Sequence, residues 1–137
     1  FCGYHMGDYF AHWIEMGEIL GEKAPKIFNV NWFRQDENGK FMWPGFGDNL
    51  RVLDWILERC EDNVDAKETP IGYLPYVEDN TEGLDIEKET LEKILTVNNE
   101  EWLGEAAGIE EFYQKFGDKL PAELKNQLNA LKQRLSN

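Results

Sequence analysis

Positive charge is scarce in this 137-residue chain, which has 14 lysines and arginines against 27 acidic residues and a formal net charge of −13. Phosphate backbones and anionic lipid surfaces attract basic proteins, so this balance argues against nucleic acid and against a membrane as partners. The charge is also uneven, since residues 1–60 carry 6 basic and 9 acidic residues and residues 61–137 carry 8 and 18. We therefore expect the second half to be solvated helix surface, and the near-neutral first half to repel an anionic ligand least.

Cysteine and histidine are also few, with two residues of each. Cys2 and Cys60 lie 58 positions apart without a CxxC pair, which argues against a structural zinc site. We expect two buried free thiols in a cytosolic protein, although a single disulfide stays open as an alternative. His5 and His12 lack the partner spacing of a metal site, so we expect core or capping roles for them.

Long apolar runs are absent as well. No stretch of about 18 apolar residues and no charged start before an apolar segment is present, so we expect neither a membrane span nor a signal peptide. The 42% hydrophobic and 13% aromatic content is enough for a core, which argues against disorder. The chain starts Phe-Cys-Gly without an initiator methionine, so we expect a piece of a longer protein, a single partial domain over residues 1–137.

Motifs for catalysis are missing too. Residues 17–23, GEILGEK, have the wrong spacing for a phosphate loop and follow no hydrophobic strand. The acidic pairs Glu87/Glu89 and Glu100/Glu101 fall in expected first turns of helices, where the helix dipole explains them. We therefore expect no catalytic residue and no metal ligand in the chain.

What the chain does have is a concentration of aromatic rings over residues 31–49, around an acidic turn that contains glycine. Rings set among Gly, Pro and Asn build flat slots better than regular core, and a slot suits a planar base. Phe46 lies between two glycines before an expected helix start, whose unpaired N–H groups could donate to a carbonyl. The Asn49 side chain offers both a donor and an acceptor for the edge of a base. The rings are those of Trp32, Phe33, Phe41, Trp43 and Phe46.

Turn and strand signals predict a short antiparallel strand pair beside these rings. Residues 26–33 alternate like a strand, residues 35–40 contain the Asn-Gly turn signal, and residues 41–43 would be the return strand, stopped by proline. Residues 61–70 are expected to be a polar loop, and residues 69–76 a further extended piece.

Helical periodicity predicts most of the remaining structure, so the fold class is α+β and helix-rich. A helix over residues 50–60, capped by Asp48 or Asn49, would place one apolar face toward the core. That face consists of Leu53, Ile56, Leu57 and Cys60. The other expected helices cover residues 7–20, 86–95 after an Asp85 cap, 100–116 and 121–135.

Several segments resemble GTP-dependent phosphoenolpyruvate carboxykinase, and the likeness spans the whole chain. They are the opening F-x-GY-x-x-GDY-x-AHW, FNVNWFR at 28–34, NGKFMWPGFGDN at 38–49, RVL at 51–53, TPIGY at 69–73 and ALKQR at 130–134. The ATP-using carboxykinases are not similar over the aromatic segment. The resemblance implies the C-terminal part of a carboxykinase-like nucleotide-binding domain, with a guanine-pocket region over residues 1–76 and acidic C-terminal helices over residues 77–137.

The resemblance also implies a binding site. Members of the family sandwich guanine between two phenylalanines, which match Phe33 and Phe46, with a third at its edge, which matches Phe41. The loop after the second ring contacts the base, and a tryptophan supports the wall of the pocket. The implied site residues are Trp32, Phe33, Phe41, Phe46, Gly47, Asp48 and Asn49.

The family is a decarboxylating lyase and kinase of gluconeogenesis, which converts oxaloacetate and GTP to phosphoenolpyruvate, carbon dioxide and GDP with manganese and a second divalent metal. Its phosphate loop, reactive cysteine, manganese ligands, oxaloacetate-binding arginines and lid have no counterpart in this chain. We therefore expect the fragment to be inactive by itself and to have as partners a guanine nucleotide, GTP or GDP, and the missing N-terminal part of its parent. The resemblance implies a cytoplasmic, monomeric parent, and the excised piece is expected to self-associate through uncovered apolar surface.

Two other interpretations of the rings stay open. A stand-alone module would use exposed Trp32 and Trp43 to grip a sugar or a proline-rich peptide, and its binding would ignore nucleotides. A purely structural packing element would bury Phe33 and Phe46 completely, with no groove between them.

Overall fold

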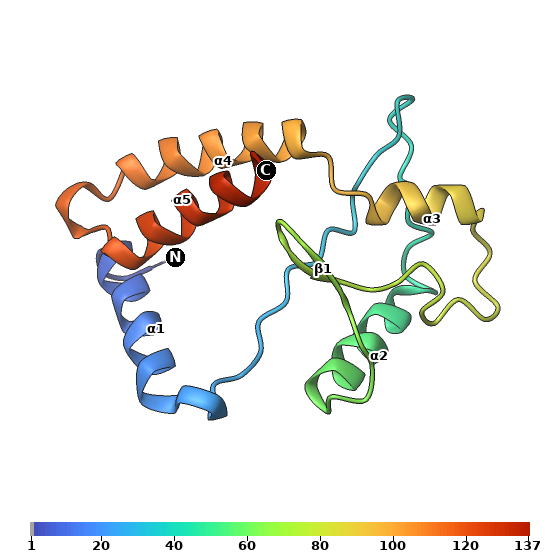
Figure 1. The fold of residues 1–137 in the computed structure, drawn as a ribbon, viewed down its shortest axis with the longest axis horizontal. Coiled ribbons are helices and arrows are strands. Elements are labelled where there is room, and N and C mark those ends of the chain that lie inside the picture. The colour runs from blue at the N-terminus through green and yellow to red at the C-terminus, as the bar shows by residue number, and fades with distance from the viewer. Residues whose placement is uncertain (1) are drawn as a thin grey trace. The chain divides into compact units, whose positions relative to one another are not determined.

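The computed structural model describes residues 2–137 (Figure 1). Five α-helices, two short 3₁₀ helices and a two-stranded antiparallel sheet follow one another along this part of the chain, which confirms the helix-rich α+β class. The chain forms two compact units, Phe1–Pro25 with Val97–Asn137 and Lys26–Thr96. The functional boundary at residue 76 is implied by the resemblance alone, and it stays a prediction.

The first unit packs α1 (Met6–Leu20) with the helix pair α4 (Asn99–Gln114) and α5 (Ala122–Leu135). The helices α4 and α5 lie side by side, joined through the 3₁₀ helix Gly117–Lys119 (Figure 1). The buried side chains of the pair are those of Ala106, Leu128 and Leu135. The ring of Phe116 makes T-shaped contacts with Phe10 and Phe112, with centroids 5.6 and 5.1 Å apart, and these contacts join α1 to the end of α4.

The start of α1 is held by one side chain and one close backbone approach. His5 caps the helix because its Nδ1 accepts the N–H of Gly7 at 3.0 Å, which confirms a capping role for this histidine. Gly7 is buried against the backbone carbonyl of Lys119. The Lys119 ammonium donates to Asp8 at 2.8 Å, and this bond lowers the pKa of the Asp8 carboxyl. His12 lies exposed on the same helix, so the expectation of a core or capping role is wrong for it.

The second unit contains α2 (Asn49–Cys60), the strands β1 (Lys67–Thr69) and β2 (Gly72–Leu74), and α3 (Lys88–Leu95). The strands pair antiparallel, with Lys67 opposite Leu74 and Thr69 opposite Gly72. Gly72 has φ 128°, a conformation that glycine adopts most easily, and the Thr69 hydroxyl donates to its carbonyl at 2.6 Å. The strand pair is therefore real, but it lies in a stretch that was expected to be partly polar loop.

The strand pair expected beside the aromatic turn is wrong. Residues 26–33 have no strand, and the pairing there is a single bridge between Gln35 and Phe41. One reason is local, because the Asn31 side chain accepts the N–H of Phe33 at 2.9 Å and so takes a donor that a strand ladder would use. The turn itself is present where the Asn-Gly signal predicts it.

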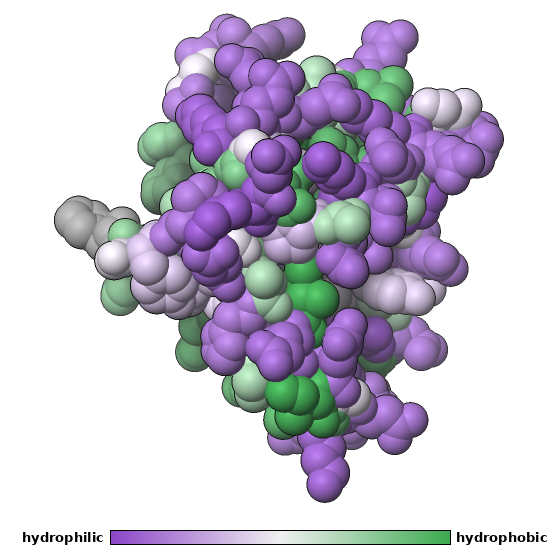
Figure 2. All heavy atoms as spheres, turned by 90° about the vertical axis from the view of Figure 1, so that its left-hand side faces the viewer, coloured by the Kyte–Doolittle hydropathy of each residue, from purple (hydrophilic) through white to green (hydrophobic). Residues whose placement is uncertain are grey.

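The expected core face of α2 is also wrong. Leu53 and Leu57 are 48% and 62% exposed, whereas Trp55 is the buried residue of this helix. The Trp55 ring meets Phe28 edge-on, with centroids 6.2 Å apart, and its indole N–H donates to Asp79 at 3.2 Å. Apolar side chains thus reach the surface of this unit. The face drawn in Figure 2, which is the left-hand side of Figure 1, likewise has apolar side chains in green among hydrophilic ones.

Both cysteines are free and exposed, so the expected burial of Cys2 and Cys60 is wrong although their free state is confirmed. The helix ends lie within about two residues of those predicted. The caps differ, because α3 begins after Glu87 and α5 after Pro121. No helix in residues 2–137 has the length and apolar character needed to cross a membrane.

Candidate functional site: an open aromatic pocket

The turn at residues 35–40 is held by a web of backbone bonds. Gly39 donates to the carbonyl of Asp36 at 3.0 Å, and Asp36 donates to the carbonyl of Lys40 at 2.9 Å. The Asp36 carboxylate accepts the N–H groups of Lys40 and Asn38, both at 2.9 Å, and these two bonds lower its pKa. Arg34 fastens the base of the turn to the end of α3 by donating to the carbonyl of Ile94 at 2.9 Å. Hydrogen bonds within the turn and to α3 therefore fix the backbone of residues 35–40 without a sheet.

This turn brings two rings together. The centroids of Phe33 and Phe41 lie 5.7 Å apart, with the ring planes inclined at 59°. The two side chains are 69% and 52% exposed, so neither ring is part of a core. The interpretation of the rings as a packing element predicts complete burial, and it is therefore not favoured.

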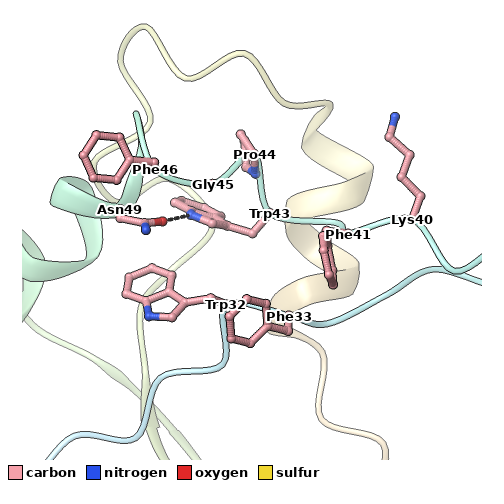
Figure 3. A pocket seen from close by; sticks show the side chains of 9 residues that line it. All are labelled: Trp32, Phe33, Lys40, Phe41, Trp43, Pro44, Gly45, Phe46 and Asn49. Atoms are coloured by element: carbon pink, nitrogen blue, oxygen red, sulfur yellow. Dashed lines mark hydrogen bonds between the residues drawn. The ribbon is translucent and has the colours of Figure 1, made fainter.

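A second turn presents Phe46. Gly45 has φ 105° and its carbonyl accepts the N–H of Asp48 at 3.0 Å, which closes a tight turn with Phe46 and Gly47 at its centre. Phe46 is 95% exposed, and its ring stands above the loop that leads into α2 (Figure 3). A large apolar ring held this far into solvent gains little stability from burial, so Phe46 is not part of a core.

Asn49 and Asp48, two further predicted site residues, lie at the start of α2, and only Asn49 reaches the pocket. Asn49 lines the pocket, and its side-chain oxygen accepts the indole N–H of Trp43 at 2.8 Å. Asp48 instead pairs with Arg51, from Nε to Oδ1 at 2.9 Å, and it makes no side-chain cap bond to the helix. The Arg51 guanidinium also donates to the carbonyls of Asn80 and Glu82, at 3.0 and 2.7 Å, so it ties the helix start to a distant loop.

The cavity between these elements has a volume of about 480 Å³, within the usual range of small-molecule pockets. Five predicted site residues line it, whereas Gly47 and Asp48 do not. The lining residues are Trp32, Phe33, Lys40, Phe41, Trp43, Pro44, Gly45, Phe46 and Asn49 (Figure 3). Lys40, Trp43, Pro44 and Gly45 also line the cavity but are not among the implied site residues, and their position among the rings is the signal that could have found them.

The shape and apolar ring faces of the lining are suited to hold a flat ligand. The lining offers apolar ring faces, the half-buried amide of Asn49 and the ammonium group of Lys40, and none of its nine residues is His, Cys, Ser, Asp or Glu. Within residues 2–137, no group of three or more His, Cys, Asp or Glu side chains could hold a metal ion. The fold and the site thus define a helix-rich α+β domain with a ring-lined binding pocket.

Comparison with known proteins names the family. Residues 1–134 match the phosphoenolpyruvate carboxykinase C-terminal P-loop domain, and the chain belongs to this family. It is 51% identical over 137 residues to the phosphoenolpyruvate carboxykinase [GTP] of Renibacterium salmoninarum, and 52% identical over 138 residues to that of Neocallimastix frontalis. These matches cover 98% of this chain but only 23% and 22% of the two relatives, so the chain spans less than a quarter of their length.

Proposed function

We propose that this chain is the guanine-recognition portion of a GTP-dependent phosphoenolpyruvate carboxykinase. The single observation that carries the proposal is the open pocket, in which three exposed phenylalanines surround a cavity of about 480 Å³ beside an unburied helix start. Relatives about half identical to this chain bear the name phosphoenolpyruvate carboxykinase [GTP], which supports guanine as the base.

In this proposal the base stacks between Phe33 and Phe46, while Phe41 braces the first ring. Stacking on aromatic side chains is worth about 1–3 kcal/mol per base and accepts any base, because each has a π-face. Choice between purines then depends on directed hydrogen bonds from Asn49 and from the backbone of the loop through Gly47 and Asp48. Trp32 forms one wall.

The whole enzyme would convert oxaloacetate and GTP to phosphoenolpyruvate, carbon dioxide and GDP, as a cytoplasmic step of gluconeogenesis. Phosphoryl transfer needs metal ions and cationic groups at the phosphates. In this proposal the manganese of that reaction is held by parts of the enzyme outside this chain. The share of this chain in the activity is therefore to hold the base, and the other parts of a monomeric parent act on the phosphates.

The proposal is tested by the Michaelis constant for GTP of the intact enzyme that carries this chain. Phe33→Ala and Phe46→Ala are each expected to raise it roughly 5- to 150-fold, the equivalent of one lost stacking contact. Tyr73→Ala is the matched control, because it removes a ring of similar exposure, 62%, that does not line the pocket. Unchanged constants in both phenylalanine variants would overturn the proposal.

Binding by the chain itself is tested by tryptophan fluorescence, since Trp32 and Trp43 both line the pocket. We expect quenching by GDP and not by ADP, with a dissociation constant near the millimolar range, about 4 kcal/mol, because every phosphate contact is absent. A stand-alone module for sugars or peptides predicts no response to either nucleotide, in the chain or in the intact enzyme. The isolated chain is further expected to self-associate at high concentration, which sedimentation would detect.

A further inference from the structure

One hydrogen bond inside the pocket joins two side chains that both line it. The indole Nε1 of Trp43 lies 2.8 Å from the side-chain oxygen of Asn49. The oxygen and nitrogen of an amide are distinguished by their partners, and an indole N–H can only donate. The atom that faces Trp43 is therefore the carbonyl oxygen, and the orientation of the Asn49 amide follows from chemistry alone.

The other half of the amide then has a fixed direction. Figure 3 shows the Asn49 nitrogen turned away from Trp43 toward the side on which Trp32 lies. Among residues 2–137 no hydrogen bond donated by this nitrogen is present, although the side chain is only partly exposed. The backbone on either side is restricted, since Asn49 opens α2 and Trp43 precedes Pro44. The pocket thus holds one preorganised donor without a partner.

We propose that Trp43 is a positioning residue that locks the Asn49 carboxamide as a donor, so that the pocket selects purines with a carbonyl at position 6 over purines with an amino group there. The inference rests on the proposed function, because it assumes that a purine occupies the cavity. The locked N–H accommodates the 6-carbonyl of guanine or hypoxanthine. It opposes the 6-amino group of adenine, which leaves two donors facing each other, and unpaired polar groups are costly in a partly desolvated site.

The consequence of losing Trp43 is a loss of discrimination. Without the indole N–H, the Asn49 amide can rotate by roughly 180° around its last single bond. In one orientation its nitrogen donates to guanine, and in the other its oxygen accepts from adenine. Stacking on the phenylalanines is unaffected by this rotation. The signature is therefore a change in the ratio of affinities and not a uniform weakening.

The test compares the inhibition constants of GDP, IDP and ADP, each competing with GTP in the intact enzyme. Trp43→Phe is expected to raise the constants for GDP and IDP by the same factor, roughly three- to tenfold, with a smaller change for ADP. Asn49→Asp is the second variant, since a carboxylate still accepts from Trp43 but turns an oxygen toward the ligand. It is expected to reduce the preference for GDP over ADP further than Trp43→Phe does. Trp32→Phe makes the same chemical change on a ring without this bond, and it should shift all three constants alike.

The outcomes separate the two proposals. If Phe46→Ala raises all three constants while Trp43→Phe leaves the ratio of ADP to GDP unchanged, the positioning role is overturned and the pocket stands. The role is equally overturned if Trp43→Phe weakens all three nucleotides by one factor, because the indole would then act only as a wall. If neither Phe33→Ala nor Phe46→Ala changes any of the constants, the proposed function fails, and this inference fails with it.

Discussion

The rings of Phe33 and Phe41 lie in contact on the protein surface, with centroids 5.7 Å apart and planes inclined at 59°. Each ring therefore restricts the orientation of the other. We expect the losses of GDP affinity in Phe33→Ala and Phe41→Ala to be less than additive in the double variant, by about 0.5–1.5 kcal/mol. Titration calorimetry of the four forms measures this coupling. Additive losses of affinity for Phe33 and Phe41 would contradict this coupling. The control is the pair Phe41 and Phe46, which has no ring contact among the described residues.

The turn that supports this contact should be sensitive to acid. The N–H groups of Lys40 and Asn38 hold the pKa of the Asp36 carboxyl below its ordinary 3.8. Because the folded-state pKa is the lower one, the carboxylate stabilises the turn fully above pH 3.8, and this contribution is lost as the pH falls through the lowered value. Carbon NMR titration of Asp36, with amide exchange at Asn38 and Lys40, measures both effects.

Two variants sharpen the acid test. Asp36→Asn keeps an acceptor oxygen without a proton to gain, so amide exchange in the turn should no longer depend on pH in this window. Glu37→Gln removes a neighbouring charge, and it should leave the dependence in place. A titration midpoint of Asp36 at or above 3.8 would contradict the prediction.

Gly7 is predicted to tolerate no side chain. A Cβ there would collide with the backbone carbonyl of Lys119, which cannot move aside as a flexible side chain can. We expect Gly7→Ala to lower the free energy of unfolding by about 1–3 kcal/mol. Gly17→Ala on the same helix meets nothing within 4 Å and should raise stability by up to about 1 kcal/mol, because alanine favours helix. Thermal unfolding of the two variants should therefore shift in opposite directions.

Burial also separates two leucines that sequence periodicity treats alike. Leu128 on α5 is 7% exposed, whereas Leu57 on α2 is 62% exposed. Leu128→Ala should cost about 2–5 kcal/mol of stability by leaving a cavity, while Leu57→Ala should change it by less than about 0.5 kcal/mol. Urea unfolding of each variant measures the difference, and equal losses would show that α2 is packed against something the described chain does not contain.

The exposed thiols give a direct chemical test. Cys2 and Cys60 are both free and accessible, so a thiol reagent should modify both in the native protein about as readily as in the unfolded protein. Cys60→Ser should leave one reactive group. Thiols that react only after unfolding would show that Cys2 and Cys60 are buried in the native protein.

The helices were predictable from sequence because their signals are local. Spacing of apolar residues located α1, α4 and α5, but it could not tell which face of α2 is covered. The answer depends on Trp55, whose indole N–H reaches Asp79 24 positions further along the chain. Strand prediction failed for the opposite reason, since the side chain of Asn31 took the N–H of Phe33 locally. The real pair, β1 and β2, is only three residues long in each strand, too short for a pattern of alternation.

The pocket was predictable in part. The rings and Asn49 stand out by composition and by resemblance, and the structure places them around one cavity. Asp48 could not be excluded from sequence, because its removal from the lining depends on the ion pair with Arg51. The bond between Trp43 and Asn49 was equally hidden, since it depends on where two turns place a ring and an amide.

Every residue that lines the cavity lies between Trp32 and Asn49, in one uninterrupted stretch of chain. Bringing such close neighbours together costs little loop-closure entropy. A site of this kind can be transferred between proteins as one continuous segment. Under the proposed function, substitutions confined to this stretch are enough to change the preference for a base.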